Sequence, residues 1–258
     1  MVSFEDLIFT VREGVATMTL NRPEKLNAFR NQTLAELNKG LTQAIRDRSV
    51  GVIVLAGAGG KAFSVGGDIS EMKSLNRKTG RIFVQNLLRL GKTFLTCPKP
   101  IVAKVNGYCI GGGNEIQLFC DLTIASDKSV FGQVGPKVGS APLWGGTQIL
   151  PLLVGLKKAK EIVFLCKQYT AAEAVQMGLI NQVVPESDLE RTVETICKEI
   201  LAKSPQSIRL VKKALHRNLI AALQKDLKDL EKIYGTTELA EGMNAFLEKR
   251  AADFSRFR

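Results

Sequence analysis

Short apolar segments alternate with amphipathic ones over roughly the first 185 residues of the 258-residue chain. Residues 6–20 are rich in β-forming side chains that partly alternate, and a turn at Arg12, Glu13 and Gly14 predicts a hairpin. Further along, the apolar spacing predicts a helix over 31–47, a strand over 51–57, a helix over 78–96 and a strand over 101–103. Such β/α alternation favours a buried, mostly parallel sheet.

Helical patterns dominate the remainder of the chain. The spacing predicts an extended piece over 129–132, a loop over 133–147, a short strand over 181–185, and helices over 148–166, 171–177, 187–203, 205–222 and 224–250. We therefore expect an α/β core over residues 1–190 and a helical region over residues 191–258. The late helices are amphipathic with little core of their own, so they must pack on the core or on another subunit, and an oligomer is expected.

The composition is that of an ordinary globular protein, with 45% hydrophobic and 24% charged residues. No apolar run approaches the ~20 residues that span a membrane, and the acidic N-terminus does not have the form of a secretory signal. The five cysteines are scattered and show no CxxC spacing. Free thiols of this kind are typical of a reducing compartment, so the sequence predicts a cytoplasmic protein with no membrane partner.

The formal net charge of +11 raises the question of a nucleic-acid partner. The basic residues are dispersed, however, aromatic residues make up only 6% of the chain, and no groove-reading motif is present. Nucleic acid is therefore an unlikely partner. A small polyanionic ligand, such as a phosphate-bearing cofactor, fits a mildly basic surface equally well, and general solubility is the plainer explanation.

Two glycine turns, SVGGD at 64–68 and IGGGNE at 110–115, each follow a predicted strand. Glycine lets the backbone approach a ligand closely, and a helix that starts behind the turn offers free N–H groups. Two such turns side by side could aim two N–H groups at one oxygen and form an oxyanion hole. The plainer alternative is a pair of tight turns before buried helices. Glu115 would lie just inside the second helix, where its carboxylate could reach the same ligand.

Several motifs together point to a family. The segments AFSVGGDISEM, KVNGYCIGGGNEIQLFCDLTIAS, FGQ, GGTQ and EGMNAFLEKR occur in this order over nearly the whole chain. In these the sequence resembles the crotonase (enoyl-CoA hydratase/isomerase) superfamily. The resemblance implies an α/β fold, a crotonase-like spiral of β-β-α repeats with a helical C-terminal trimerisation region. It also implies homotrimers or homohexamers and acyl-CoA thioester substrates. CoA would be carried as part of the substrate, so no separate cofactor is expected, and no metal-ligand cluster is visible.

The resemblance also implies roles for individual residues. The oxyanion N–H groups fall on Gly67 and Gly112, and Glu115 matches the first of two catalytic glutamates that position water and move its proton. Lys249 matches a residue that meets the CoA phosphate, although it could equally be a solvated helix lysine. Asp68 lies in a CoA-binding segment, but capping of the following helix is the preferred interpretation. The family's CoA-binding segments fall on Lys25, Leu26, Ser64, Gly66, Asp68 and Ile69.

Gly135 stands where hydratases carry their second glutamate, two residues after the glutamine of FGQ. A two-glutamate hydration cannot then be assumed, and a simple isomerase is also disfavoured, because isomerases of the family usually keep that second glutamate. The loop VGPKVGS resembles naphthoate synthase and the hydrolases that open the ring of oxocyclohexane-carboxyl-CoA. Pro142 departs from that pattern as well, since it occupies the place of their aspartate.

The remaining candidates have open alternatives. Trp144 lies in the loop expected to line the acyl pocket, where it could shape a flat pocket for a cyclic acyl group, or it could be a core or trimer-contact aromatic. Ser140 could hydrogen-bond the substrate or only form the turn. His216, the sole histidine, is expected on a surface helix, so no histidine triad is predicted. Tyr108 and Cys109 flank the second glycine turn and are expected to pack.

Together these features predict an acyl-CoA lyase. The reaction would be hydration or dehydration of an unsaturated acyl-CoA, with a cyclic dienoyl-CoA as the sharper hypothesis, through an enolate stabilised by the oxyanion hole. One alternative is an acyl-CoA decarboxylase or carbon–carbon bond enzyme of the same superfamily. Another is a noncatalytic CoA- or RNA-binding relative, suggested by the net charge alone.

Overall fold

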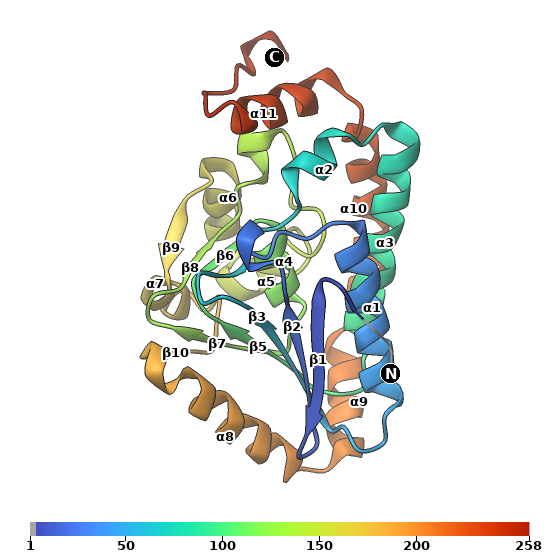
Figure 1. Cartoon of the computed structure of the whole chain (residues 1–258), viewed down its shortest axis with the longest axis vertical. Coiled ribbons are helices and arrows are strands. Elements are labelled where there is room, and N and C mark those ends of the chain that lie inside the picture. The colour runs from blue at the N-terminus through green and yellow to red at the C-terminus, as the bar shows by residue number, and fades with distance from the viewer. Residues whose placement is uncertain (1–3, 258) are drawn as a thin grey trace.

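Two β-sheets form the centre of the molecule in the computed structural model, which describes residues 4–257 (Figure 1). The larger sheet has the order β1-β2-β3-β5-β7-β10 and the smaller one β4-β6-β8-β9. The pairs β1–β2 and β8–β9 are antiparallel and the others are parallel. The strands are β1 (Leu7–Arg12), β2 (Val15–Leu20), β3 (Val52–Gly57), β4 (Ala62–Ser64), β5 (Ile101–Val105), β6 (Tyr108–Ile110), β7 (Leu122–Ser126), β8 (Val130–Gly132), β9 (Gln168–Thr170) and β10 (Gln182–Val184).

The chain winds between the sheets in a spiral. A strand of the larger sheet is followed by one of the smaller sheet in β3–β4, again in β5–β6, and again in β7–β8. Helices follow each pair: α2 (Ile69–Lys73) and α3 (Arg77–Thr96) after β4, α4 (Gly112–Leu118) after β6, and α5 (Leu150–Val154) and α6 (Leu156–Leu165) after β8. This arrangement confirms the expected spiral of β-β-α units with a helical C-terminal region.

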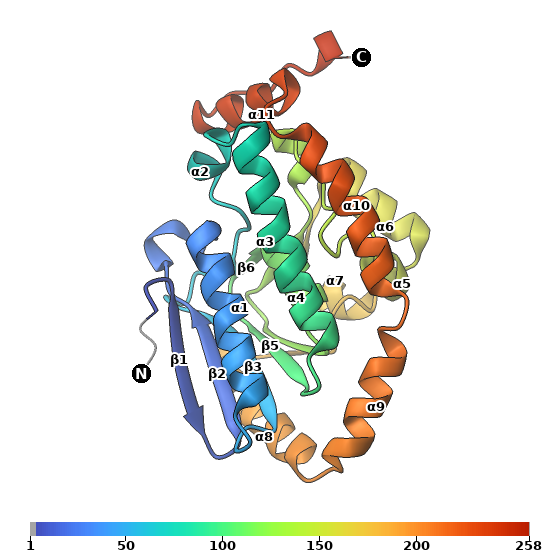
Figure 2. The ribbon, with the colours of Figure 1, turned by 90° about the vertical axis from the view of Figure 1, so that its right-hand side faces the viewer.

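Helices cover both faces of the larger sheet, which explains its apolar strands. On one face α1 (Asn31–Arg46), α3 and α10 (Leu219–Ile233) lie side by side (Figure 2). On the other face α8 (Leu189–Leu201) packs across β3, β5 and β7. In β3, Ile53 faces the core shared with α1 and α3, whereas Val52 faces α8. A strand buried on both sides needs apolar side chains at successive positions.

Three of the helix predictions are wrong about where the helices end. The spacing over 205–222 and 224–250 predicts two helices, but the chain forms α9 (Pro205–Leu215), α10 and α11 (Thr237–Leu247). The last break falls at Gly235, whose φ is +83°, followed by Thr236, which caps α11. Gly155, with φ of +78°, likewise divides the helix predicted over 148–166 into α5 and α6. A left-handed glycine ends a helix even where the apolar period continues.

The sequence prediction also missed several strands. The sequence predicts that the segment around Glu115 starts as a helix, and it does so in α4, but β7 follows and pairs with β5 and β10. Strands β4, β6 and β9 have three residues each. So short a strand shows no alternation that a sequence pattern can detect. The predicted hairpin at the N-terminus is confirmed by β1 and β2.

The C-terminal helices share the main core. Leu223, Leu227 and Leu230 of α10 belong to the same buried cluster as Ile53 of the larger sheet, and α11 packs against α2. The division of the chain near residue 190 stays a prediction, and apolar packing continues across it. No helix within residues 4–257 is both long enough and apolar enough to cross a membrane.

Candidate active site

The two glycine turns lie against each other because they follow neighbouring parallel strands. SVGGD continues from β4 and IGGGNE continues from β6, and these two strands pair in the smaller sheet. A Cβ atom on Gly66 would lie 2.8 Å from the backbone nitrogen of Gly112, and one on Gly113 would clash with the carbonyl of Ser64. The close approach of the turns therefore depends on glycine at these positions.

The backbone N–H groups of Gly67 and Gly112 take no part in the hydrogen bonds that hold the turns. Phe29 forms an isolated parallel bridge with Gly67. Its N–H donates to Gly66 O at 2.8 Å, and its carbonyl accepts from Asp68 N at 2.8 Å. This pattern leaves the Gly67 N–H on the opposite side. Gly112 is the first residue of α4, where an N–H has no partner within the helix.

Glu115 follows in the first turn of α4, with its side chain turned into the protein. The residue is only 7% exposed. Its Oε1 accepts hydrogen bonds from the N–H of Trp144 at 2.9 Å and of Gly146 at 3.4 Å. Burial raises the pKa of Glu115 to about 8, against the opposing effect of those two hydrogen bonds. The carboxyl group can therefore gain or lose a proton near neutral pH, as acid–base catalysis requires.

A cavity of about 730 Å³ joins Glu115 to both glycine turns. This volume is within the range of small-molecule binding sites. Among the residues predicted for the site, those that line the cavity are Lys25, Leu26, Gly67, Asp68, Ile69, Gly112, Glu115, Gly135, Ser140 and Trp144. The structure thus brings together residues from four separate stretches of the sequence.

Three predicted site residues do not line the cavity. Ser64 is fully buried; its Oγ donates to Asn27 O at 2.8 Å and accepts from Gly66 N at 3.2 Å. The serine therefore supports the first glycine turn from behind instead of facing a ligand. Gly66 lies in that turn, against Gly112. Lys249 is exposed just beyond α11, whose Phe246 and Leu247 line the cavity.

The loop residues Trp144 and Ser140 both have a structural role and both line the cavity. Trp144 is 1% exposed and packs against Phe29 and Phe119, with ring centroids 6.0 and 5.2 Å apart, so it is a core aromatic that also lines the cavity. Ser140 closes the loop turn by donating its N–H to Gly135 O at 3.0 Å, while the residue also lines the cavity.

Asp68 caps the helix that follows it, as the sequence indicated. One carboxylate oxygen accepts from Ser70 N at 3.1 Å, and the other pairs with Arg22 at 3.1 Å.

We expect Asp68→Ala to lower the free energy of unfolding by about 1–2 kcal/mol. Asp68→Asn keeps the cap and loses the ion pair, so urea unfolding should show a smaller decrease in the free energy of unfolding than for Asp68→Ala. An Asn variant as unstable as the Ala variant would contradict the capping role.

Much of the remaining wall of the cavity consists of residues that the sequence motifs do not single out. They come from α2, α3, α10, α11 and the residue that follows α10, and they include Met72, Phe83, Leu87, Leu230, Tyr234 and Phe246. Their sequence signal is the ordinary apolar spacing of a helix, which does not distinguish a core contact from a cavity wall.

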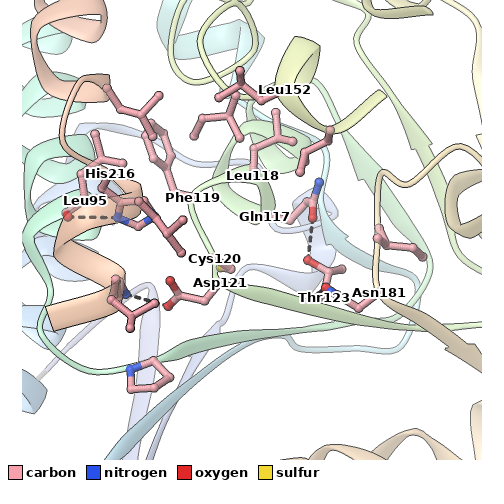
Figure 3. Close-up of a pocket in the computed structure, with 18 of the residues that line it drawn as sticks. Leu95, Gln117, Leu118, Phe119, Cys120, Asp121, Thr123, Leu152, Asn181 and His216 are labelled. Carbon is pink, nitrogen blue, oxygen red and sulfur yellow. Dashed lines mark hydrogen bonds and ion pairs between the residues drawn. The ribbon is translucent and has the colours of Figure 1, made fainter. Parts of the chain in front are cut away.

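A second cavity, of about 620 Å³, lies between α4, α5 and α9 (Figure 3). Its polar groups are paired with one another: Lys212 with Asp121 at 2.6 Å and Thr123 with Gln117 at 2.6 Å. Contacts of this kind hold the fold together and leave little to bind a ligand. The first cavity, with its buried carboxyl group, is the better candidate for an active site.

His216 borders that second cavity at the end of α9, a largely exposed helix, as the sequence predicts. It is the half-buried cap residue at the end of α9, and its Nδ1 lies 3.1 Å from Leu95 O. The imidazole thus ties α9 to the end of α3. It lies outside the lining of the first cavity, and so has no part in the chemistry considered there.

Comparison with known proteins gives one family. The model of a family described as enoyl-CoA hydratase/isomerase matches residues 10–256. A solved enoyl-CoA hydratase from Mycobacterium avium subsp. paratuberculosis K-10 is 27% identical, with 98% of this chain and 99% of that chain covered and a TM-score of 0.88. An enoyl-CoA hydratase/isomerase from Xanthobacter autotrophicus Py2 is 30% identical, with 99% and 100% covered and a TM-score of 0.86. An enoyl-CoA hydratase from Bacillus anthracis is 32% identical, with 97% and 99% covered and a TM-score of 0.79.

The spiral of two-strand units, with two glycine turns and a buried carboxyl group on one cavity, defines an enzyme of the crotonase superfamily. The chain belongs to the enoyl-CoA hydratase/isomerase family.

Proposed function

We propose that the protein is an acyl-CoA lyase that adds water to an unsaturated acyl-CoA or removes it from the hydrated product. The observation that carries the proposal is the position of Glu115, a buried carboxyl group on the same cavity as Gly67 and Gly112. The N–H groups of these two glycines would bind the thioester oxygen and stabilise its charge as the enolate forms.

A single carboxylate can complete this cycle. Ionised Glu115 takes a proton from water, and the hydroxide forms a bond to the unsaturated carbon that is conjugated to the thioester. The electron pair moves to the thioester oxygen as the enolate. Glu115 then returns the proton to carbon, and the carboxylate is regenerated. Dehydration is the same sequence in reverse, so both directions begin with the ionised form.

The acidic residues of the cavity support a mechanism with one glutamate. Besides Glu115, the acidic residues that line it within the described chain are Glu24, which is exposed, and Asp68, which is tied to Arg22 and to the start of α2. Gly135 adds no carboxyl group. A conjugated diene could place the reacting carbon further from the carbonyl, where one glutamate would serve, and Trp144 would offer a flat wall. A cyclic dienoyl-CoA is the sharper substrate proposal for these reasons.

The test is a screen of linear and cyclic acyl-CoA thioesters with mass detection of products. A gain or loss of one water molecule supports the proposal. Loss of carbon dioxide from a malonyl-type CoA supports instead the second candidate, a decarboxylase that uses the same enolate. Salt-sensitive binding of RNA without turnover of any thioester would favour a noncatalytic relative.

We further propose that the protein is a cytoplasmic homotrimer or homohexamer. The large apolar side chains of α5, α6 and α9 include Leu152, 72% exposed, and Leu215, 75% exposed, together with Phe164. Leu152 and Leu215 both border the second cavity, and exposed large apolar side chains such as these support a contact surface for a second copy of the chain. Light scattering of the purified protein should give three or six subunits, and Leu215→Lys with Phe164→Lys should lower that number. A monomeric wild-type protein would contradict the proposal.

A further inference from the structure

Tyr234 lies directly after α10, and its ring is fixed in the inner wall of the cavity. The residue is 3% exposed, and its ring meets Phe83 edge-on with centroids 5.9 Å apart. Gly80 of α3 makes room for it, because a Cβ atom there would lie 2.6 Å from Tyr234 Cγ. A ring clamped between α3 and the end of α10 holds its hydroxyl group in one place.

The hydroxyl group of Tyr234 has no hydrogen-bond partner among the described residues. The fully enclosed polar side-chain atoms that lack a partner belong to Asn114, Gln133, Trp144 and Asn244, and the Tyr234 hydroxyl is not one of them. It must therefore open onto the space beside it, which is the cavity. A buried hydroxyl without a partner costs about 1–3 kcal/mol. A ligand or water in the cavity that accepts its hydrogen bond would remove this cost.

Glu115 is the charged group that acts on the pKa of this hydroxyl. Burial raises the pKa of Tyr234 well above its usual value, and the Glu115 carboxylate raises it further. Tyr234 therefore keeps its proton at any physiological pH and can act as a hydrogen-bond donor throughout. The carboxyl group of Glu115 and the phenol of Tyr234 thus border one cavity: the first can exchange a proton, and the second keeps its proton and can donate a hydrogen bond.

We propose that Tyr234 is a positioning residue that donates a hydrogen bond to the oxygen atom on which Glu115 acts. That oxygen is the attacking water in hydration and the departing hydroxyl in dehydration. Tyr234 would hold it where a second carboxyl group is missing at Gly135, while Glu115 alone transfers the proton. This inference rests on the proposed function, because it concerns a reaction in which an oxygen is added to or lost from the acyl group.

The experiment compares two reactions of the same site in Tyr234→Phe. One is hydration of the unsaturated acyl-CoA found in the screen. The other is exchange of the α-hydrogen of the matching saturated acyl-CoA with D₂O, followed by mass, which needs the oxyanion hole and Glu115 but no oxygen at the reacting carbon. We expect kcat for hydration to fall about tenfold or more and the exchange rate to stay within about twofold. The melting temperature should not fall, because the lost hydroxyl has no partner in the protein.

Tyr169→Phe is the matched control. Tyr169 is also buried, but its hydroxyl donates to Glu161 at 2.9 Å and lies outside the first cavity, so both reactions should be unchanged. If Tyr234→Phe lowers kcat for hydration and the exchange rate equally, the role of Tyr234 is merely structural and the inference is overturned. The inference is also overturned if neither rate falls. A wild-type protein that performs neither reaction on any thioester would overturn the proposed function, and the inference with it.

Discussion

Glu115→Gln is expected to lower kcat for hydration by about a thousandfold. Glutamine keeps the side-chain oxygen that accepts from the N–H groups of Trp144 and Gly146, so the loop should stay in place. It cannot take a proton from water or return one to carbon. No other buried carboxyl group lines the cavity within the described residues to replace it. The loss should therefore appear in kcat, with little change in the affinity for CoA.

Glu36→Gln is the control for this variant. Glu36 is also buried and accepts backbone hydrogen bonds, from Glu5 and Asp6 at 2.9 and 2.8 Å, but it does not line the cavity. It should keep full activity. Unchanged kcat in Glu115→Gln would show that Glu115 is not the proton carrier.

The pH dependence follows from the same group. The cycle starts from ionised Glu115 in either direction, so kcat/KM should rise with pH and level off above its pKa of about 8. Stability should change in the opposite sense. A carboxyl group whose pKa is raised by folding adds stability below its unfolded pKa, and this contribution is lost as pH rises through about 8. The melting temperature of Glu115→Gln relative to wild type should therefore increase between pH 5 and pH 9.

Gly112→Ala is expected to lower kcat by about a hundredfold, because it displaces one donor of the oxyanion hole. The new Cβ atom would lie 2.5 Å from Phe29 Cζ. The ring of Phe29 is buried and its backbone is paired with the first glycine turn. Either the ring or the turn must move, at a cost of about 1–3 kcal/mol in stability. Steady-state kinetics and urea unfolding measure the two effects.

Two further variants separate loss of the donor from loss of stability. Gly40→Ala would place a Cβ atom 2.7 Å from Cε of the fully buried Met18, and neither residue lines the cavity, so it should lower stability and leave kcat unchanged. Adding Phe29→Leu to Gly112→Ala frees space for the methyl group and should restore part of kcat. Full activity in Gly112→Ala alone would show that this N–H does not act on the substrate.

The sequence determines much of the larger sheet and most of the site's chemistry. Residues 51–57 form one unbroken apolar run, and that alone identifies a strand buried on both faces. The glycine turns and Glu115 stand out for a similar reason. The close approach of the two turns requires glycine, and proton transfer requires an ionisable group such as Glu115. Each requirement can be recognised from the residue type at a single position.

Other features depend on contacts between distant parts of the chain. The pairing of β4 with β6 places the two turns together, and strands of three residues carry too little pattern to predict it. The high pKa of Glu115 comes from burial beneath the Trp144 loop. In the sequence, Tyr234 is an aromatic residue before a glycine, and no motif marks it as a site residue. Only the packing of α10 on α3 brings its hydroxyl to the cavity, because burial and proximity are properties of the assembled core and not of local residue spacing.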